Sequence, residues 1–185
     1  MKMKLRTLAL TTLASAMLSG YAFADVPPGS QGNGEITFKG SVIKAPCGLA
    51  PGLDGDNQSI NLGQIADAQL RTVGYSAPKD FKIKLIGCNF DPAATAETKV
   101  NVRFDGMSVG AANGFLGVSG DAKGVAIRLL DAANKHVKIG AITDNYSLRS
   151  GDNTLQFSAQ VVALDGQDIV AGTYDAMTNF SLTYL

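Results

Sequence analysis

The sequence is poor in the residues that usually carry catalysis, metal binding or nucleic-acid recognition. Its 185 residues include no Trp, one His and two Cys, and charged residues make up 17% of the chain. One His and two Cys are too few for a zinc or haem site with several protein ligands. Basic and acidic residues number 16 each, so no surface for a nucleic acid is indicated. We therefore expect no cofactor, no nucleic-acid partner and no small-molecule substrate.

Extended apolar stretches are also scarce, and the one at the N-terminus has the features of a targeting signal. Three basic residues in the first six positions precede residues 8–18, which are apolar or small. Eleven such residues fall well short of the ~20 that a membrane-spanning helix needs. Ala22 and Ala24 then supply the small–x–small pattern that a signal peptidase accepts. The sequence predicts that residues 1–24 form a cleaved secretory signal.

Removal of this signal changes the charge of the chain. The remaining 161 residues carry 13 basic and 16 acidic side chains, which is a formal charge of −3. A mildly acidic protein is a poor partner for nucleic acid or anionic lipid. Export also places Cys47 and Cys88 in an oxidising compartment, where two cysteines with none left over predict one disulfide. Closing the loop between Cys47 and Cys88 stabilises the fold by about 4 kcal/mol in the loop-entropy model.

The rest of the chain alternates between apolar and polar residues and has almost no helical periodicity. Period-2 alternation of this kind predicts β-strands with one buried face, separated by Gly, Pro, Asn and Asp turns. Only residues 64–71 are compatible with a short helical turn. Seven or more short strands predict an all-β, antiparallel sandwich. The expected strands cover residues 35–39, 81–85, 99–104, 125–129, 137–139, 155–163 and 180–184.

The two ends of the processed chain depart from the pattern of an ordinary sandwich. Residues 25–34 are rich in Pro and Gly and poor in bulky side chains, which predicts an extended arm. At the other end the chain stops on the alternating strand of Phe180, Leu182 and Tyr184. An apolar strand at a sheet edge associates with other chains unless something covers it. An arm and an open edge together suggest strand exchange between copies.

Three blocks of sequence resemble the pilin subunits of chaperone–usher fimbriae, especially the major subunits of P-type pili. The first is residues 34–47, where an alternating run with Phe and Gly precedes Cys47, and the second is residues 81–89 around Cys88. The third is the C-terminal block, with a penultimate aromatic, Tyr184, and a glycine fourteenth from the end, Gly172. The blocks have the order and spacing of that family and span essentially the whole processed chain.

The resemblance implies an incomplete immunoglobulin-like sandwich that lacks its last strand. Residues 41–185 would form the pilin domain, with a groove beside the C-terminal strand. In that family a periplasmic chaperone first fills the groove, and the N-terminal arm of the next subunit, here residues 25–40, then replaces it. An outer-membrane usher assembles the subunits into a surface fimbrium. The groove would involve Gly172, Phe180, Leu182 and Tyr184.

The same resemblance assigns a donor role to alternate residues of the arm. These residues share one parity and would point together into a neighbour's groove, with Gly34 at the family's small donor position. Here the chain departs from the family pattern, because several donor positions are Gly and few bulky residues precede Ile36. The donor residues are Gly32, Gly34, Ile36, Phe38 and Gly40.

Other motifs have simpler interpretations. Residues 106–110 match the G-x-S-x-G pattern around Ser108, but no helical pattern follows and the chain is short for that hydrolase fold, so we expect a loop and no enzyme. His136 lies on the polar side of an expected strand and should be at the surface. Residues 54–57 begin like a calcium loop but lack its required Gly and Glu. The prediction is a structural pilin; the alternative is a minor adaptor, terminator or receptor-binding adhesin of the same organelle.

Overall fold

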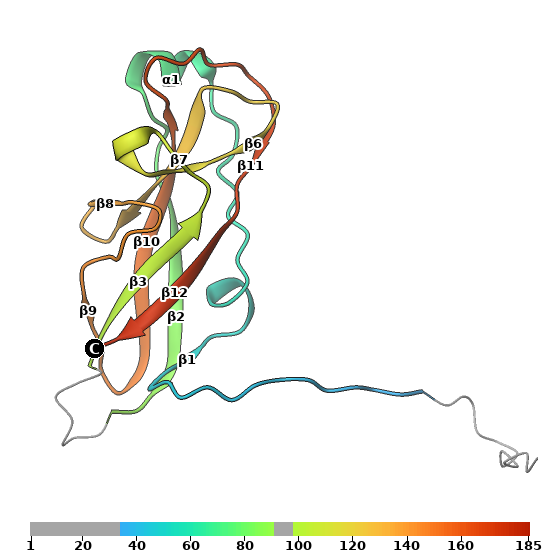
Figure 1. Ribbon diagram of the computed structural model, residues 1–185, viewed down its shortest axis with the longest axis vertical. Coiled ribbons are helices and arrows are strands. Elements are labelled where there is room, and N and C mark those ends of the chain that lie inside the picture. Colours follow the sequence, from blue (N-terminus) through green and yellow to red (C-terminus); the bar gives the residue numbers. More distant parts are fainter. Residues whose placement is uncertain (1–33, 91–97) are drawn as a thin grey trace, which may run out of the picture. The chain divides into compact units, whose positions relative to one another are not determined.

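The computed structural model describes residues 34–90 and 98–185 (Figure 1). The chain divides into two units, residues 1–42 and 43–185. The predicted signal and Gly32 lie outside the described residues. Among the described residues, no helix has the length and apolar character needed to cross a membrane.

The 43–185 unit is built from antiparallel strands, as the alternation predicts. A large sheet has the strand order β1-β2-β10-β7-β5-β4, with β8 added beside β7. A second sheet has the order β12-β3-β9, and a two-stranded ribbon joins β11 to β6. The strands are β1 (Gly48–Leu49), β2 (Lys79–Cys88), β3 (Lys99–Gly106), β4 (Ser108–Val109), β5 (Phe115–Gly117), β6 (Ser119–Gly120), β7 (Val125–Asp131), β8 (His136–Val137), β9 (Tyr146–Ser147), β10 (Gly151–Ala163), β11 (Tyr174–Asp175) and β12 (Thr178–Tyr184).

The core lies between the β2–β10–β7 sheet and the β3–β12 sheet. Both sheets point their alternate apolar side chains inward, and Ile83, Phe104 and Phe157 are each no more than 2% exposed. The three-ring cluster of Phe81, Phe104 and Phe157 has centroid separations of 5.1–6.2 Å. Edge-to-face and stacked contacts of this kind add to the burial of apolar area. This arrangement confirms the predicted antiparallel sandwich.

Among the described residues, helical structure is confined to three short pieces: α1 (Asp67–Val73) and the 3₁₀ turns η1 (Gly52–Asp54) and η2 (Ala111–Asn113). The helical turn expected at residues 64–71 is therefore present but begins later and extends to Val73. Gly74 ends it in the left-handed conformation, with φ of 87°, and its N–H bonds to the Leu70 carbonyl. Leu70 is buried in a second, smaller apolar cluster with Val125, Val161 and Ile169.

One feature of β10 contradicts the expectation of a single buried face. Residues 157–162 are buried on both faces, including Ser158 and Gln160. On the face away from the core, Arg128 lies over the ring of Tyr75, 5.3 Å from its centroid. The Gln160 side-chain oxygen, with the amide turned toward Arg128, accepts hydrogen bonds from that guanidinium. These long side chains cover the second face, so a polar residue in the pattern does not mark an exposed one.

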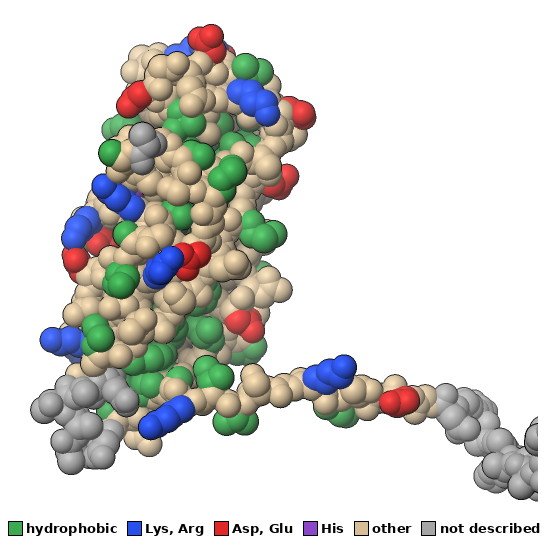
Figure 2. Space-filling view, in the orientation of Figure 1, with side chains coloured by type: hydrophobic (Ala, Val, Ile, Leu, Met, Phe, Trp, Pro, Cys, Tyr) green, Lys and Arg blue, Asp and Glu red, His purple; other side chains and the backbone are tan. Residues whose placement is uncertain are grey.

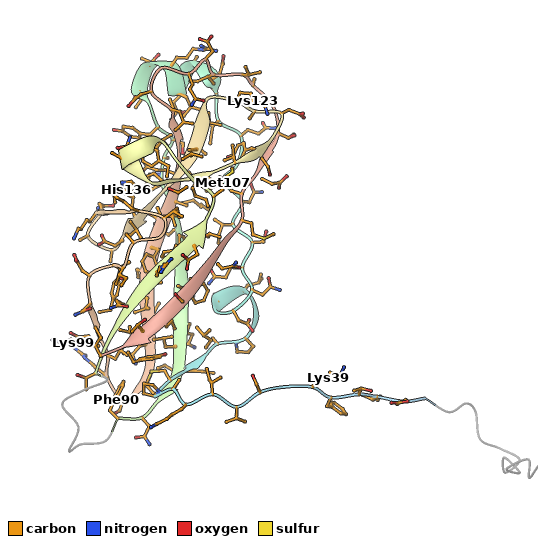
Figure 3. All side chains as sticks on the ribbon, in the orientation of Figure 1. Lys39, Phe90, Lys99, Met107, Lys123 and His136 are labelled. Carbon is orange, nitrogen blue, oxygen red and sulfur yellow. A yellow bond between two sulfur atoms is a disulfide. The ribbon has the colours of Figure 1, made fainter. Side chains whose placement is uncertain are left out.

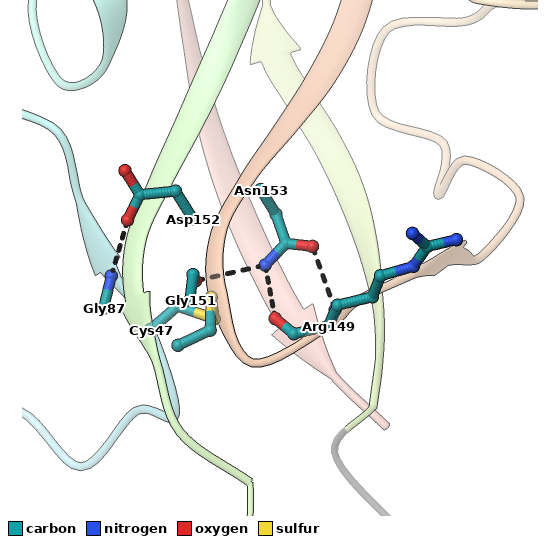
Figure 4. The surroundings of a disulfide bond; sticks show 7 residues. Cys47, Gly87, Arg149, Gly151, Asp152 and Asn153 are labelled. Carbon is teal, nitrogen blue, oxygen red and sulfur yellow. Dashed lines mark hydrogen bonds between the residues drawn. A yellow bond between two sulfur atoms is a disulfide. The ribbon is translucent and has the colours of Figure 1, made fainter.

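Cys47 and Cys88 form the predicted disulfide (Figure 4). It joins the chain just before β1 to the last residue of β2. The neighbouring turn into β10 is held by Asn153, whose side chain bonds to both the N–H and the carbonyl of Arg149. Asp152 accepts a hydrogen bond from the Gly87 N–H at 3.2 Å. This end of the large sheet is therefore fixed by covalent and polar contacts together.

Candidate functional site

A groove runs beside β12 on the 43–185 unit. It consists of two adjoining cavities of about 580 and 760 Å³. Both are lined by the same five residues at their junction: Gln58, Ile60, Leu62, Ile127 and Ala176. Figure 2 shows apolar side chains exposed over this face of the molecule, with charged side chains widely spaced among them.

The floor of the first cavity is the hydrophobic core itself. Ile83, Phe104 and Leu129 line it, although they are buried members of the main core cluster, and the partly buried Phe81 packs against that cluster and lines the cavity too. A core is normally packed to the density of an organic crystal, with few voids larger than a water molecule. An opening of several hundred Å³ over core residues therefore means that, within residues 34–90 and 98–185, no element covers this part of the core.

One rim of the groove is the free edge of β12. Lys99 and Leu185 exchange both backbone hydrogen bonds, at 3.2 and 2.8 Å, so they form a hydrogen-bonded antiparallel pair. Because such pairs alternate with non-hydrogen-bonded ones, Phe180, Leu182 and Tyr184 oppose β3 without bonding to it. Their N–H and C=O groups therefore point away from β3, toward the open side.

The opposite edge of β3 supports this assignment. The Val102 carbonyl accepts a hydrogen bond from the Thr143 N–H, and the Val102 N–H donates to the Thr143 hydroxyl, both at 2.9 Å. The Phe104 carbonyl likewise accepts from the Gly140 N–H at 2.7 Å. Val102 and Phe104, which oppose Leu182 and Phe180, thus form these backbone hydrogen bonds on the edge of β3 that faces away from β12.

The second rim is the segment 57–65, which runs alongside without joining a sheet. Among the described residues, positions 58–65 make no backbone–backbone hydrogen bond. Gln58 anchors the segment through its side-chain amide, which donates to the carbonyls of Lys82 and Gly55. The groove therefore lies between the outer edge of β12 and a segment whose backbone groups, at residues 58–65, bond to no other backbone group that the structure describes; the Gly63 N–H donates instead to the Asn61 side chain at 2.8 Å. The sequence signal for this rim is the alternation of Ile60 and Leu62 with polar residues.

The predicted groove residues do not all occupy the same position. Phe180 lines the first cavity, and its ring centroid lies 6.4 Å from that of Phe104. Gly172 lines the second cavity. Leu182 and Tyr184 pack half-buried against the core but line neither cavity. Burial raises the pKa of the Tyr184 phenol above its usual value of 10.0, so it stays neutral in this apolar setting.

Gly172 is required by a close backbone approach. A Cβ built there would lie 2.7 Å from the Ala122 nitrogen and 2.8 Å from the Asp121 carbonyl carbon. The same contact is held by hydrogen bonds from the N–H groups of Asp121 and Ala122 to the Thr173 carbonyl. Gly172 thus lets the chain before β11 lie directly against the loop after β6.

The arm, described from residue 34, contains no strand, so the strand expected at 35–39 is not formed within this chain. Ile36 and Phe38 are 78% and 89% exposed, although their alternation is typical of a half-buried strand. A Cβ added at Gly34 or Gly40 would meet no atom within 4 Å. The pattern in the arm is therefore that of a strand without a partner.

The residues of the hydrolase-like motif are not assembled into a catalytic site. Ser108 lies in β4, a two-residue strand paired with β5, and not on a turn from a strand into an α-helix. In the described part of the chain, no hydrogen bond joins Ser108 to His136. His136 itself is half-buried, not at the surface as expected, with its ring 5.1 Å from that of Phe115 (Figure 3). The pairing of β8 with β7 draws it under Phe115.

The acidic turn at residues 54–57 serves the fold. Asp54 lies 3.4 Å from the Lys82 ammonium, and Asp56 accepts a hydrogen bond from the Gly52 N–H at 2.7 Å. Across residues 34–90 and 98–185, no three His, Cys, Asp or Glu side chains are grouped as a metal site would need.

Comparison with known proteins identifies the family to which this chain belongs. Residues 36–185 match the family described as Fimbrial protein. The Fimbria A protein of Serratia marcescens is 36% identical over 98% of this chain and 99% of its own length. The Major MR/P fimbria protein of Proteus mirabilis is 37% identical with the same coverage of both chains.

Two solved structures share the fold over the whole of their own chains. One is a subunit of a chaperone–usher pilus described in connection with rod uncoiling, with a TM-score of 0.74, 30% identity and 86% of this chain covered. The other is the P pilus rod subunit PapA, with a TM-score of 0.68, 31% identity and 76% of this chain covered.

Proposed function

The chain belongs to the fimbrial protein family and is an exported structural subunit of a surface-displayed chaperone–usher fimbria, and we propose that it polymerises by donor-strand exchange. Residues 25–40 of one copy act as the donor strand, and residues 41–185 of the next copy act as the acceptor domain. Each subunit then completes its neighbour's sandwich. This proposal assigns no catalytic role and no cofactor to the chain.

The observation that carries the proposal is the groove with two unpaired edges above an open core. A strand inserted between β12 and the 57–65 segment would bond to the outward-facing backbone groups of both rims. Its alternate side chains would cover Phe81, Phe104 and Leu129. Burying a Phe or Ile side chain contributes about 1.5–3 kcal/mol each. The exposed Ile36 and Phe38 of the arm offer that apolar surface.

The open groove also implies a partner before assembly. An apolar edge strand promotes aggregation when nothing covers it. We assign that covering role to a periplasmic chaperone, which supplies a strand until the arm of the next subunit replaces it. We assign the transfer of the subunit from the chaperone into the fibre to an outer-membrane usher. The relatives compared above include a major fimbrial subunit and a rod subunit, and nothing observed favours the adaptor or adhesin alternative.

The test is a pair of substitutions in the arm with the same added charge. Phe38→Asp places a carboxylate among the apolar donor residues, whereas Thr37→Asp places it on the opposite side of the same strand. We expect Phe38→Asp to abolish fibres and Thr37→Asp to leave them, as seen by electron microscopy of cells producing the variant. Fibres formed at wild-type levels by Phe38→Asp, or by a chain lacking residues 25–40, would overturn the proposal.

A further inference from the structure

The outward side of β3 carries an ordered row of charges. Its inward residues Val100, Val102 and Phe104 are no more than 1% exposed, so Lys99, Arg103 and Asp105 share the opposite side. Arg103 donates to Asp105 at 2.8 Å, and these two side chains form an ion pair. The row therefore runs from the cations Lys99 and Arg103, toward the start of the strand, to the Asp105 carboxylate toward its end. Figure 3 places Lys99 at the end of the sandwich where β3 begins.

The neighbouring rims of the groove carry few charges: Asp56 lines the first cavity, where it accepts a hydrogen bond from the Gly52 N–H, and Asp67 and Asp175 line the second cavity. The outward residues of β12 are Asn179, Ser181 and Thr183, which are short, uncharged and exposed. They lie directly opposite Asp105, Arg103 and Asn101 in the strand register. On the other rim, residues 57–65 include no charged side chain. The row on β3 is therefore the set of charges on the strand next to β12, directly across from its uncharged outward residues.

The arm carries a matching pair of charges on one side. Glu35, Thr37 and Lys39 alternate with the exposed apolar residues Ile36 and Phe38. The Thr37 hydroxyl donates to a Glu35 carboxylate oxygen at 3.3 Å, which shows that these two side chains lie on the same side. When Ile36 and Phe38 enter a groove, Glu35 and Lys39 face outward.

We propose that these two charge rows set the direction in which the donor arm of a second copy enters the groove. The inference rests on the proposed donor-strand exchange. With the arm antiparallel to β12, Thr37 opposes Ser181, so Lys39 lies across Asn179 from Asp105. Glu35 then lies across Thr183, between the positions of Lys99 and Arg103. In the reversed direction Lys39 meets those two cations and Glu35 meets Asp105, so every pair is repulsive.

The distances allow these side chains to interact. The arm and β3 would be two strand spacings apart, which is about 9.6 Å. A Lys or Arg side chain spans most of that gap, and Ser181 and Asn179 are too short to obstruct it. Exposed ion pairs contribute modestly and are screened by salt. The arm can form similar backbone hydrogen bonds to β12 in either direction. The direction that brings together two attractive charge pairs is then favoured over the direction that brings together like charges.

The experiment measures how fast the mature chain, purified as a monomer, takes up a labelled synthetic peptide of residues 25–40. The test peptide carries Glu35→Lys and Lys39→Glu, which reverses the charge order and keeps the composition. We expect it to bind about fivefold more slowly at low salt, with the difference lost in 1 M NaCl. The acceptor variant with Lys99→Glu, Arg103→Glu and Asp105→Lys should reverse that preference. These side chains are exposed, so its unfolding midpoint should match the wild type.

A nitroxide on position 33 of the native-order peptide reports the direction itself. It should broaden NMR signals near Leu185 and leave those near Thr178 sharp. Equal rates for both peptides, or broadening near Thr178, would overturn the charge assignment while leaving donor-strand exchange intact. Failure of the unmodified peptide to bind would instead count against donor-strand exchange.

Discussion

In the part of the chain that the structure describes, β10 lies between two neighbouring strands, whereas β12 has a neighbour on one edge only. Both strands alternate apolar and polar residues. In β10 the inward residues Phe157 and Val161 are 2% and 1% exposed, but in β12 the inward residues Phe180, Leu182 and Tyr184 remain half-exposed. The difference shows that burial depends on neighbouring strands more than on the residues of the strand itself. β12 is a core strand that lacks its second neighbour.

The largest expected difference between β10 and β12 is the stability that each loses when one aromatic ring is truncated. Phe157→Ala should lower the free energy of unfolding by about 3–5 kcal/mol, because a fully packed ring leaves a cavity. Phe180→Ala should cost about 1–2 kcal/mol, because part of that ring is already in water. Denaturant unfolding of the mature chain measures both. Equal losses at the two positions would mean that β12 is packed as tightly as β10.

Loss of the disulfide should weaken the end of the large sheet where β1 pairs with β2. Replacing Cys47 and Cys88 by Ser removes the link between the start of β1 and the end of β2, and we expect a loss of about 2–4 kcal/mol. The wild-type chain in reducing agent is the matched control and should lose the same amount. Unchanged unfolding midpoints in both would show that the hydrogen bonds at this end suffice.

Gly172 tests the packing beside the groove, where its backbone contacts the backbone of Asp121 and Ala122. Gly172→Ala would bring a Cβ within 2.8 Å of the Asp121–Ala122 backbone, and we expect a loss of about 1–3 kcal/mol. Gly48→Ala is the control, because its Cβ would lie at an ordinary 3.5 Å from Ile86. Thermal unfolding should separate the two variants, and a Gly172→Ala chain as stable as the control would contradict the close approach.

The smallest expected effect is the pH dependence of stability from His136. Burial, together with the nearby cations Arg128 and Lys138, lowers the pKa of His136 below its usual value of 6.5. Its stabilising contribution is therefore complete above about pH 6.5 and is lost as the pH falls through the lowered pKa. Unfolding midpoints between pH 7.5 and pH 5 should fall less for His136→Gln than for the wild type. An identical fall in the two would assign the acid sensitivity to other groups.

The sequence predicted the long strands well because their alternation persists over five or more residues. β2, β3, β7, β10 and β12 all contain the expected segments. Two-residue strands such as β4 and β11 are too short to show any period. The strand expected around Ile36 and Phe38 is absent because the pattern specifies which face is apolar but not whether a partner strand exists in the same chain.

The candidate site was predictable in part. Phe180 and Gly172 line the groove, as the C-terminal block suggested. The floor of Phe81, Phe104 and Leu129 could not be assigned from the sequence, because core residues that line an opening have the same pattern as those that are sealed. Alternation puts His136 on the polar side of its strand and so predicts a surface position, but the ring of Phe115 from β5 packs against it.

Amide hydrogen exchange of β12 tests the central claim most directly. In the isolated mature chain, the amides of Ser181 and Thr183 should be protected by β3, whereas those of Phe180, Leu182 and Tyr184 should exchange quickly. On addition of a peptide of residues 25–40, the account predicts that Phe180, Leu182 and Tyr184 become protected as well. If the peptide binds and these three amides still exchange at the rate of the free chain, β12 is not the acceptor edge.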